Sequence, residues 1–444
     1  MSALRSTLAR VATMAISLVC GILTARLVVG EAGVAEYALV SLLVALPSLV
    51  SFSDLGAGAV VVNSTAVSED VRTDRMLQRQ ATTVARVILM FAGAVAVLDV
   101  LLLVTGGWRI VLGSASEVPN AELAAFVCVA IYCVTVSLGL WQRILLGLHR
   151  NPLIILLQGI ISPLSLAIVW LLLTTAPPWA TSFLALGTFV ATLTVAILGT
   201  LVADRLSAPL LHVVAREVLR PRRFPGVRVM DVGWPMFAQL LAAPLSLAVP
   251  RYVLAQSATT VELAQYALAG QVFFALSALV AAAGVALWPA FARARARGEI
   301  RRGPAAISAL FGGGIVVATA VMALIGPWFF AIVSDGHVAV PLTVVLAFGA
   351  MITLQAILYP LGMFIMDKPG IRFQVIPALL MAASTIALTS VLAPSWGVEA
   401  PLLSNAFSVL VFQIVPFAIY IRRHRDRLYG RASATGEELP VPES

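Results

Sequence analysis

Residues 304–333 read PAAISALFGGGIVVATAVMALIGPWFFAIV, an apolar stretch without a charged side chain. A helix needs about 20 apolar residues to cross the hydrocarbon core of a bilayer, which is about 30 Å thick. This stretch therefore predicts a transmembrane helix. Apolar stretches of comparable length recur from one end of the chain to the other, and the segments between them are too short for an independent soluble domain.

The composition of the 444-residue chain indicates the same class of protein. It is 60% hydrophobic and 11% charged, whereas soluble domains carry about 25% charged residues. The net charge of +8 comes from Arg-rich clusters between the apolar stretches. Such clusters are typical of membrane topology rather than of nucleic-acid binding, so we expect an all-α integral membrane protein with no nucleic-acid partner.

We predict about twelve transmembrane helices from the apolar stretches. They lie near residues 8–29, 36–62, 82–105, 121–148, 152–175, 180–203, 230–254, 263–290, 304–333, 340–366, 371–393 and 399–421. With the N-terminus inside, the basic clusters fall in alternate loops, at 72–86, 143–150, 205–228, 293–302, 368–372 and 422–431. Because cytoplasmic loops collect Arg and Lys, both termini are expected in the cytoplasm. The excess of Arg over Lys favours a GC-rich bacterial source, so we expect a multi-pass protein of a bacterial plasma (inner) membrane.

The two halves of the chain share a sequence pattern. Residues 25–28 (ARLV) and 36–39 (EYAL) correspond to 250–253 (PRYV) and 265–268 (QYAL). Six helices in each half give the halves the same orientation, so they are expected to be parallel repeats around a central cleft that rock against each other in alternating access. The predicted units are an N-terminal six-helix bundle (1–203), a basic cytoplasmic linker (204–229), a C-terminal six-helix bundle (230–421) and a disordered cytoplasmic tail (422–444).

Three short motifs carry a family resemblance. They are the first hairpin, with Arg26, a turn from Gly30 to Glu36 and then Tyr37-Ala38; the string 53–56 (SDLG); and the turn 143–150 (RILLGLHR). The chain resembles the multidrug/oligosaccharidyl-lipid/polysaccharide exporter superfamily, in particular its polysaccharide (O-antigen-type) flippase branch. The resemblance implies that an isoprenoid-diphosphate-linked saccharide moves from the inner to the outer face of the membrane. Its partners would be membrane lipid, this substrate and the glycosyltransferases or polymerase of the same pathway.

Polar residues inside membrane spans are candidate functional residues because they are costly there. Arg26 and Arg251 occupy matching places in the two repeats. Their guanidinium groups could bind a diphosphate near the outer mouth, or they could extend to the membrane interface and bind nothing. Gln239, Gln271 and Gln355 could bind sugar hydroxyls, or could join helices to one another.

Two carboxyl groups are candidates for ion coupling. Asp54 could bind a proton or sodium ion, or could form a structural turn or ion pair; Asp99 could carry a proton, or could be bonded to a neighbouring helix. The histidines and cysteines have no metal-binding spacing, and we expect no catalytic residue, metal or cofactor beyond this coupling ion.

Two other functions fit the same pattern of helices. One is a cation-coupled multidrug exporter of the same superfamily, and the other is a membrane enzyme of surface-polysaccharide assembly. The chain has neither an Asp-x-Asp motif nor a large outer loop of the kind that such enzymes use, which favours a transporter. It also has no phosphate-binding Gly-x-x-x-x-Gly-Lys loop, so an ATPase of its own is excluded.

Overall fold

The computed structural model describes residues 2–49, 58–68, 70–175, 177–222, 224–227, 245–297, 300 and 303–429, and all the regular structure in these ranges is helical. The first half contains α1 (Ser2–Leu27), η1 (Val28–Ala32), α2 (Val34–Leu49), α3 (Gly58–Val67), α4 (Arg75–Val104), α5 (Gly107–Leu112), η2 (Gly113–Glu117), α6 (Ala121–Ser137), α7 (Leu140–Gly147), α8 (Asn151–Gly159), α9 (Ile161–Thr175), η3 (Pro178–Phe183), α10 (Leu186–Ser207) and α11 (Leu210–Glu217). The second half contains α13 (Val249–Ala255), α14 (Thr260–Ala296), α15 (Ala305–Val333), α16 (Leu342–Phe364), α17 (Lys368–Trp396), α18 (Glu399–Val409), η4 (Leu410–Ile414), α19 (Val415–Arg423) and α20 (Arg425–Leu428).

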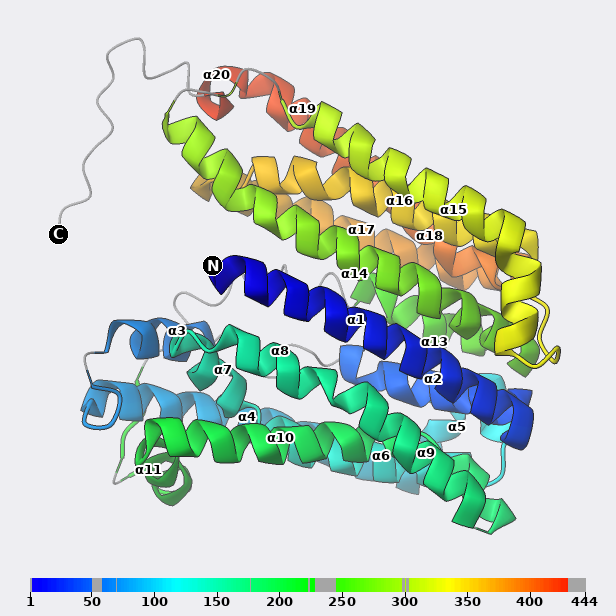
Figure 1. Ribbon diagram of the computed structural model, residues 1–444, viewed down its shortest axis with the longest axis horizontal. Coiled ribbons are helices and arrows are strands. Elements are labelled where there is room, and N and C mark those ends of the chain that lie inside the picture. Colours follow the sequence, from blue (N-terminus) through cyan, green and yellow to red (C-terminus); the bar gives the residue numbers. More distant parts are fainter. Residues whose placement is uncertain are drawn as a thin grey trace.

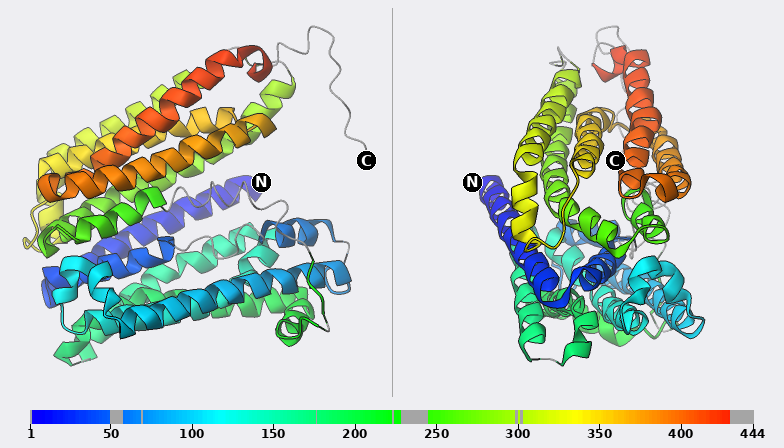
Figure 2. Two further views of the ribbon diagram at one scale, coloured as in Figure 1. Left: turned by 180° about the vertical axis from the view of Figure 1, so that it is seen from behind. Right: turned by 90° about the vertical axis from the view of Figure 1, so that its right-hand side faces the viewer.

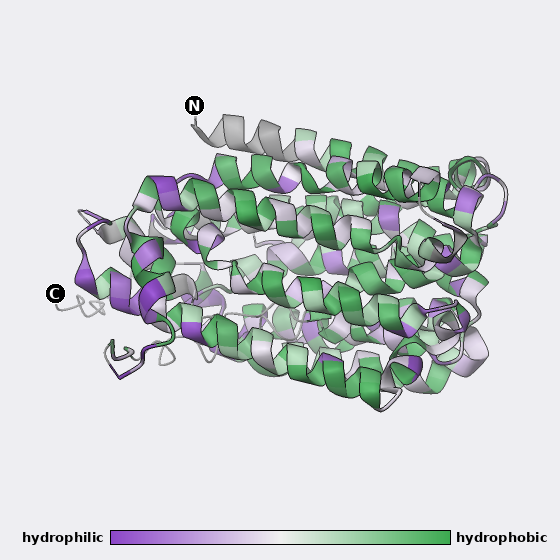
Figure 3. Ribbon diagram, turned by 90° about the horizontal axis from the view of Figure 1, so that it is seen from below, coloured by the Kyte–Doolittle hydropathy of each residue, from purple (hydrophilic) through white to green (hydrophobic). Residues whose placement is uncertain are grey.

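Within the described residues, ten helical segments are long and apolar enough to cross a membrane. They correspond to all the predicted spans except those at 36–62 and 230–254. Both of these fall partly outside the described residues, whose apolar helices there are the shorter Val34–Leu49 and Leu245–Ala255. Hydrophobic residues predominate along the helices (Figure 3). The prediction of an all-α, multi-pass membrane protein is confirmed.

The helices form two groups that diverge from one end of the molecule (Figure 1). In the first group α4 and α10 pack on α6, and α1 packs on α8 and α9; in the second, α16 packs on α14, α15 and α18. Figure 2 shows the same two groups from behind and from one end. The Arg-rich loops lie where the groups diverge, which we call the basic end, and the two groups meet at the opposite end, which we call the closed end.

The predicted linker 204–229 is partly helical and is held by side chains of α4. The Thr83 hydroxyl oxygen accepts a hydrogen bond from the backbone N–H of Val227 at 3.1 Å. Arg86 of α4 donates hydrogen bonds to three carbonyl oxygens at and beyond the C-terminus of α11, those of Glu217 (2.8 Å), Val218 (2.8 Å) and Phe224 (2.9 Å). A cation at the C-terminus of a helix also interacts favourably with the helix dipole. The described part of the linker is therefore fixed to the first group of helices.

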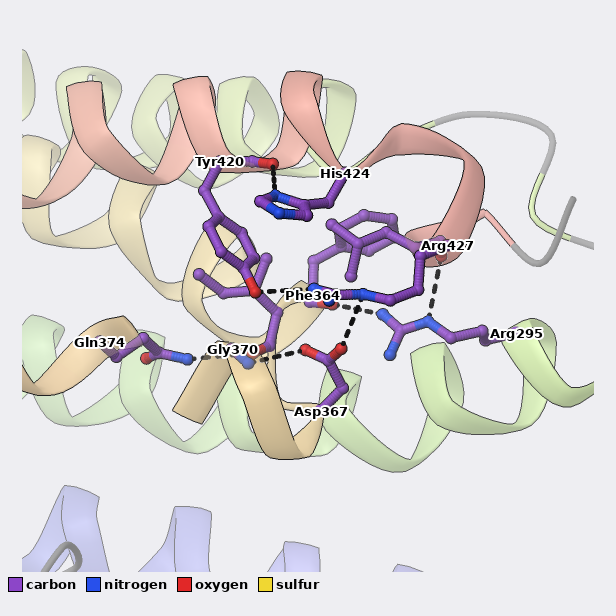
Figure 4. A network of polar contacts seen from close by, with 10 residues as sticks. Arg295, Phe364, Asp367, Gly370, Gln374, Tyr420, His424 and Arg427 are labelled. Carbon is purple, nitrogen blue, oxygen red and sulfur yellow. Dashed lines mark hydrogen bonds and ion pairs between the residues drawn. The ribbon is translucent and has the colours of Figure 1, made fainter. Parts of the chain in front are cut away.

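The start of the predicted tail 422–444 is ordered, so the prediction of disorder is wrong for residues 422–429. Leu428 is fully buried, and its carbonyl oxygen accepts a hydrogen bond from Nε of Arg295 at 3.0 Å. Arg427 lies 3.3 Å from Asp367 and donates to the Tyr420 hydroxyl at 2.6 Å (Figure 4). These contacts join the ends of α14 and α19 and the turn before α17. Burial lowers the pKa of Arg295, while the Asp367 carboxylate acts in the opposite direction.

Candidate functional site

A cavity of about 390 Å³ lies between the two groups of helices, and we call it the central cavity. Its walls come from α1, α2, α9 and α10 on one side and from α13 and α14 on the other. A second cavity of about 420 Å³ adjoins it between α1, α8 and α14, and the two share Gly21 and Gln271. The central cavity is therefore a site to which both halves of the chain contribute.

Arg251 is the one charged residue among the described residues that line the central cavity. It follows Pro250 in the first turn of α13, and its guanidinium group lies 5.5 Å from the centre of the Tyr266 ring. Its Nε is buried and has no hydrogen-bond partner among the described residues. A buried donor without a hydrogen-bond partner is costly. The cavity thus presents a cation that is able to bind an anionic group, in the paired geometry that guanidinium adopts with phosphate.

Uncharged polar groups surround this cation. Nε2 of Gln271 donates to the Tyr37 hydroxyl at 3.0 Å, and this hydrogen bond joins the two groups of helices. Ser165 and Thr188, on the opposite wall, have their hydroxyl oxygens 2.9 Å apart. The site therefore combines one positive charge with hydroxyl and amide groups.

The structure places Arg26 away from this cavity. Arg26 lies 3.3 Å from Asp335, just after α15, and both side chains are more than half exposed. The pair borders a cavity of about 680 Å³ at the closed end, which also contains Glu31 and Trp170. Arg26 and Arg251, which match in sequence, thus have different environments.

Contacts between the two groups of helices gather at the closed end. Four hydrogen bonds cross between them in the described residues: Arg26 to Asp335, Gln271 to Tyr37, Tyr252 to the Leu42 carbonyl and Gln256 to the Ile110 carbonyl. Gly113 also lies against the backbone of Ala255, because a Cβ on this glycine would be 1.9 Å from the Ala255 carbonyl oxygen. The bond of Gln271 to Tyr37 lies at the central cavity itself, and the other contacts close the molecule beyond it.

The other candidate residues lie elsewhere. Gln355 lines a separate cavity within the second group of helices. Asp99 of α4 is 2% exposed and accepts a hydrogen bond from Nε1 of Trp108 at 3.1 Å. Asp54 and Gln239 fall outside the described residues. The structure therefore brings Arg251 and Gln271 together and separates Arg26, Gln355 and Asp99 from them.

Sequence reasoning did not select Tyr37 and Tyr266 as site residues. Both belong to the repeated strings EYAL and QYAL, so their correspondence was a usable signal. Tyr37 accepts the hydrogen bond from Gln271, and the ring of Tyr266 contacts Arg251. Asp335 was also not selected, because its pairing with Arg26 joins residues that are far apart in the chain.

Comparisons with known proteins agree with this architecture. Residues 2–295 match the model of a family described as polysaccharide biosynthesis protein. The fold is similar to that of the lipid II flippase MurJ in an inward closed conformation, with a TM-score of 0.65 and 12% identity over 97% of this chain and 90% of that one. No curated protein sequence matches the chain.

Two other solved structures are similar over most of their length. One is a multidrug resistance MATE family transporter of the MOP superfamily in an inward-facing conformation, with a TM-score of 0.62 and 15% identity over 94% of this chain and 98% of that one. The other is a MOP superfamily transporter from Pyrococcus furiosus, with a TM-score of 0.54 and 14% identity over 96% of this chain and 95% of that one. At these identities the similarity shows the fold alone.

Proposed function

Because this chain belongs to the polysaccharide biosynthesis protein family, we propose that it is a flippase that moves an isoprenoid-diphosphate-linked saccharide from the inner to the outer face of a bacterial plasma membrane. The observation that carries the proposal is Arg251 in the central cavity, whose buried Nε has no hydrogen-bond partner among the described residues. A diphosphate supplies negative charge and an acceptor oxygen for this group. The hydroxyl and amide groups around it suit the polar part of the same substrate. Enzymes that assemble or polymerise the saccharide would be its partners.

The topology that we propose has twelve membrane spans and both termini in the cytoplasm. The basic end then faces the cytoplasm, as expected for Arg-rich loops, and the closed end faces outward. In this orientation the molecule is closed toward the outside, in the state that would receive substrate from the inner face. Rocking of residues 1–203 against 230–421 would expose the central cavity to the other side.

The coupling ion that we propose is a proton or sodium ion, carried by Asp99 or Asp54. The buried position of Asp99, with Trp108 as its hydrogen-bond donor and no basic residue bonded to it in the described part of the chain, supports proton binding. An uncompensated carboxylate is unfavourable in such a place, and protonation neutralises it.

The test uses purified protein in proteoliposomes and lipid-linked saccharide extracted from the native host. Arg251→Gln removes the charge, and a hydrogen bond to a charged group contributes about 1.5–3 kcal/mol. We therefore expect substrate affinity to fall about 10- to 100-fold. Arg251→Lys keeps the charge but loses the paired geometry, so it should fall between the wild type and Arg251→Gln.

The matched control is Arg109→Gln. Arg109 pairs with Glu122, is 76% exposed and lines none of the cavities described above. This variant should bind and transport as the wild type does. Wild-type behaviour of Arg251→Gln would contradict the assignment of the anion site.

A second candidate function is a cation-coupled multidrug exporter, which the similarity to a multidrug resistance transporter fold favours. A cationic drug would be attracted by acidic residues, whereas the described lining of the central cavity has Arg251 and no acid. Efflux of a cationic dye from the same proteoliposomes, without transfer of lipid-linked saccharide, would establish this alternative.

A further inference from the structure

A cavity of about 310 Å³ lies inside the second group of helices, and we call it the amide pocket. Its polar residues are Ser246, Gln355, Tyr359, Gln374, Asn405 and Gln413, contributed by the chain just before α13 and by α16, α17, α18 and η4. No charged residue occurs among the described residues that line it. A concave, largely apolar site with a few convergent polar groups is the usual form of a binding site.

The amides on one wall form a chain of hydrogen bonds. Nε2 of Gln355 donates to Oδ1 of Asn405 at 3.0 Å, and Nδ2 of Asn405 donates to the Ser246 carbonyl oxygen at 3.2 Å. The hydroxyl of Ser277 on α14 donates to Oε1 of Gln355 at 3.4 Å. The orientation of each amide is therefore set by its neighbours, and the wall is held in place before any ligand arrives.

Gln413 does not take part in this chain. It is 7% exposed, it lines the pocket, and its Oε1 is buried without a hydrogen-bond donor among the described residues. It lies in η4, a π-helical turn between α18 and α19. Single π-helical turns inside α-helices are frequent at functional sites. A buried acceptor without a partner costs about 1–3 kcal/mol, so a ligand that donates a hydrogen bond here would remove this cost.

Two helical segments connect the amide pocket with the central cavity. Ser246 and Arg251 are five residues apart on the segment Leu245–Ala255, which corresponds to a rise of about 7.5 Å. On α14, Gln271 lines the central cavity and Ser277 bonds to the wall of the amide pocket, and their separation corresponds to a rise of about 9 Å. Two helices thus connect a positively charged site to an uncharged one.

We propose that the amide pocket binds an uncharged, hydroxyl-bearing saccharide whose diphosphate is bound at Arg251. A sugar hydroxyl can donate to Oε1 of Gln413 and accept from an amide or from Tyr359, and the rings of Tyr359 and Phe417 offer apolar faces to a sugar ring. The inference rests on the proposed flippase function and adds to it the subsite that distinguishes a glycosylated lipid from the bare lipid diphosphate.

The experiment measures binding of two probes to the full-length protein in nanodiscs. One probe is undecaprenyl diphosphate, and the other is lipid-linked saccharide extracted from the native host. The wild type should bind the glycosylated lipid more tightly. Gln413→Met replaces the amide with an apolar side chain of similar length, and it should weaken binding of the glycosylated lipid about fivefold while leaving binding of the bare diphosphate unchanged. Gln355→Met tests the other wall with the same expectation.

Gln265→Met is the matched control, because Gln265 donates to the Ala339 carbonyl at 2.8 Å and lines neither cavity. It should bind both probes as the wild type does. Three outcomes for Gln413→Met and Gln355→Met would overturn the proposal. Binding of both probes could weaken equally, binding of neither could weaken, or binding of both could weaken in a way that depends on sodium ions. Equal wild-type affinity for the two probes would also overturn it while leaving the flippase function intact. If the wild type binds neither probe, both the saccharide pocket and the flippase function are wrong.

Discussion

Arg26 and Arg251 occupy corresponding positions in the two sequence repeats, and their environments differ. Arg26 is exposed and paired with Asp335, whereas Arg251 has a buried Nε that finds no hydrogen-bond partner in the described part of the chain. Their correspondence could be predicted from the repeat. The ion pair of Arg26 with Asp335 could not be predicted, because Asp335 lies 309 residues away in the chain. The sequence therefore indicates candidate residues, and tertiary packing distinguishes between them.

Asp99 allows a prediction at the scale of a single residue. Asp99→Asn keeps an oxygen that can accept the hydrogen bond from Trp108, but it cannot carry a proton. If Asp99 carries the coupling proton, this variant will fold normally, and its transport rate will no longer respond to an imposed pH gradient. The measurement is lipid transfer in proteoliposomes with and without the gradient, and Asp54→Asn is measured in parallel.

Trp108→Phe serves as the control for Asp99, because it removes the hydrogen bond and keeps the carboxyl group. Its transport should still respond to the gradient. If the response survives in both Asp99→Asn and Asp54→Asn, the proposal of proton coupling through these residues is wrong.

At the scale of helices, the positions of spans could be predicted more closely than their interruptions. Apolar length and Arg clusters gave ten segments that coincide with candidate spans. The predicted span 121–148 is divided between α6 and α7, and 399–421 contains the π-helical turn η4. These breaks depend on packing against neighbouring helices, and uniformly apolar sequences contain little information about them.

Gly113 allows a prediction at the scale of two elements, η2 and α13. It has φ of +54°, and a Cβ there would collide with the Ala255 carbonyl oxygen of the other group of helices. Gly113→Ala should therefore prevent the closed end from forming and move the population toward outward-open molecules. The measurement is the labelling rate of a cysteine placed at Ala255, which is fully buried in the closed molecule, and we expect this rate to rise.

Gly397→Ala is the matched control for this substitution. Gly397 has nearly the same backbone conformation, with φ of +53° and ψ of −127° against +54° and −128° for Gly113, but a Cβ there would meet the flexible end of the Glu262 side chain within the second group of helices. It introduces a similar backbone strain without the collision between helix groups. If both variants increase labelling equally, backbone strain is responsible and the prediction is wrong.

At the scale of the whole molecule, the sequence predicted which loops share an end and not which helices touch across the middle. The charge pattern identified the basic end. The contacts of α14 with α1 and α2, and of α13 with α5, arise from apolar surfaces that have no distinguishing sequence pattern. This is why the sequence could indicate Gln271 and Tyr37 separately but not the hydrogen bond between them.

The pair of Arg26 and Asp335 joins the two groups of helices, so its removal should affect the whole molecule. Exposed ion pairs contribute about 0.2–1 kcal/mol, so Arg26→Glu should decrease the ratio of closed to open molecules by up to about tenfold, because it adds repulsion to the loss of attraction. Spin-label distances across the closed end measure this ratio. The double variant Arg26→Glu/Asp335→Arg should restore it, and a failure of restoration would show that the pair does not hold the closed end.

The short helix α13 has two neighbouring side chains that serve different regions. Arg251 lines the central cavity, while the hydroxyl of Tyr252 donates to the Leu42 carbonyl of the other group of helices at 2.8 Å. A ligand that binds Arg251 therefore acts on the same helical turn that holds the two groups of helices together. Such effects are thermodynamically reciprocal. If bound substrate weakens the contact between Tyr252 and Leu42 by some factor, the loss of that contact must raise the affinity for substrate by the same factor.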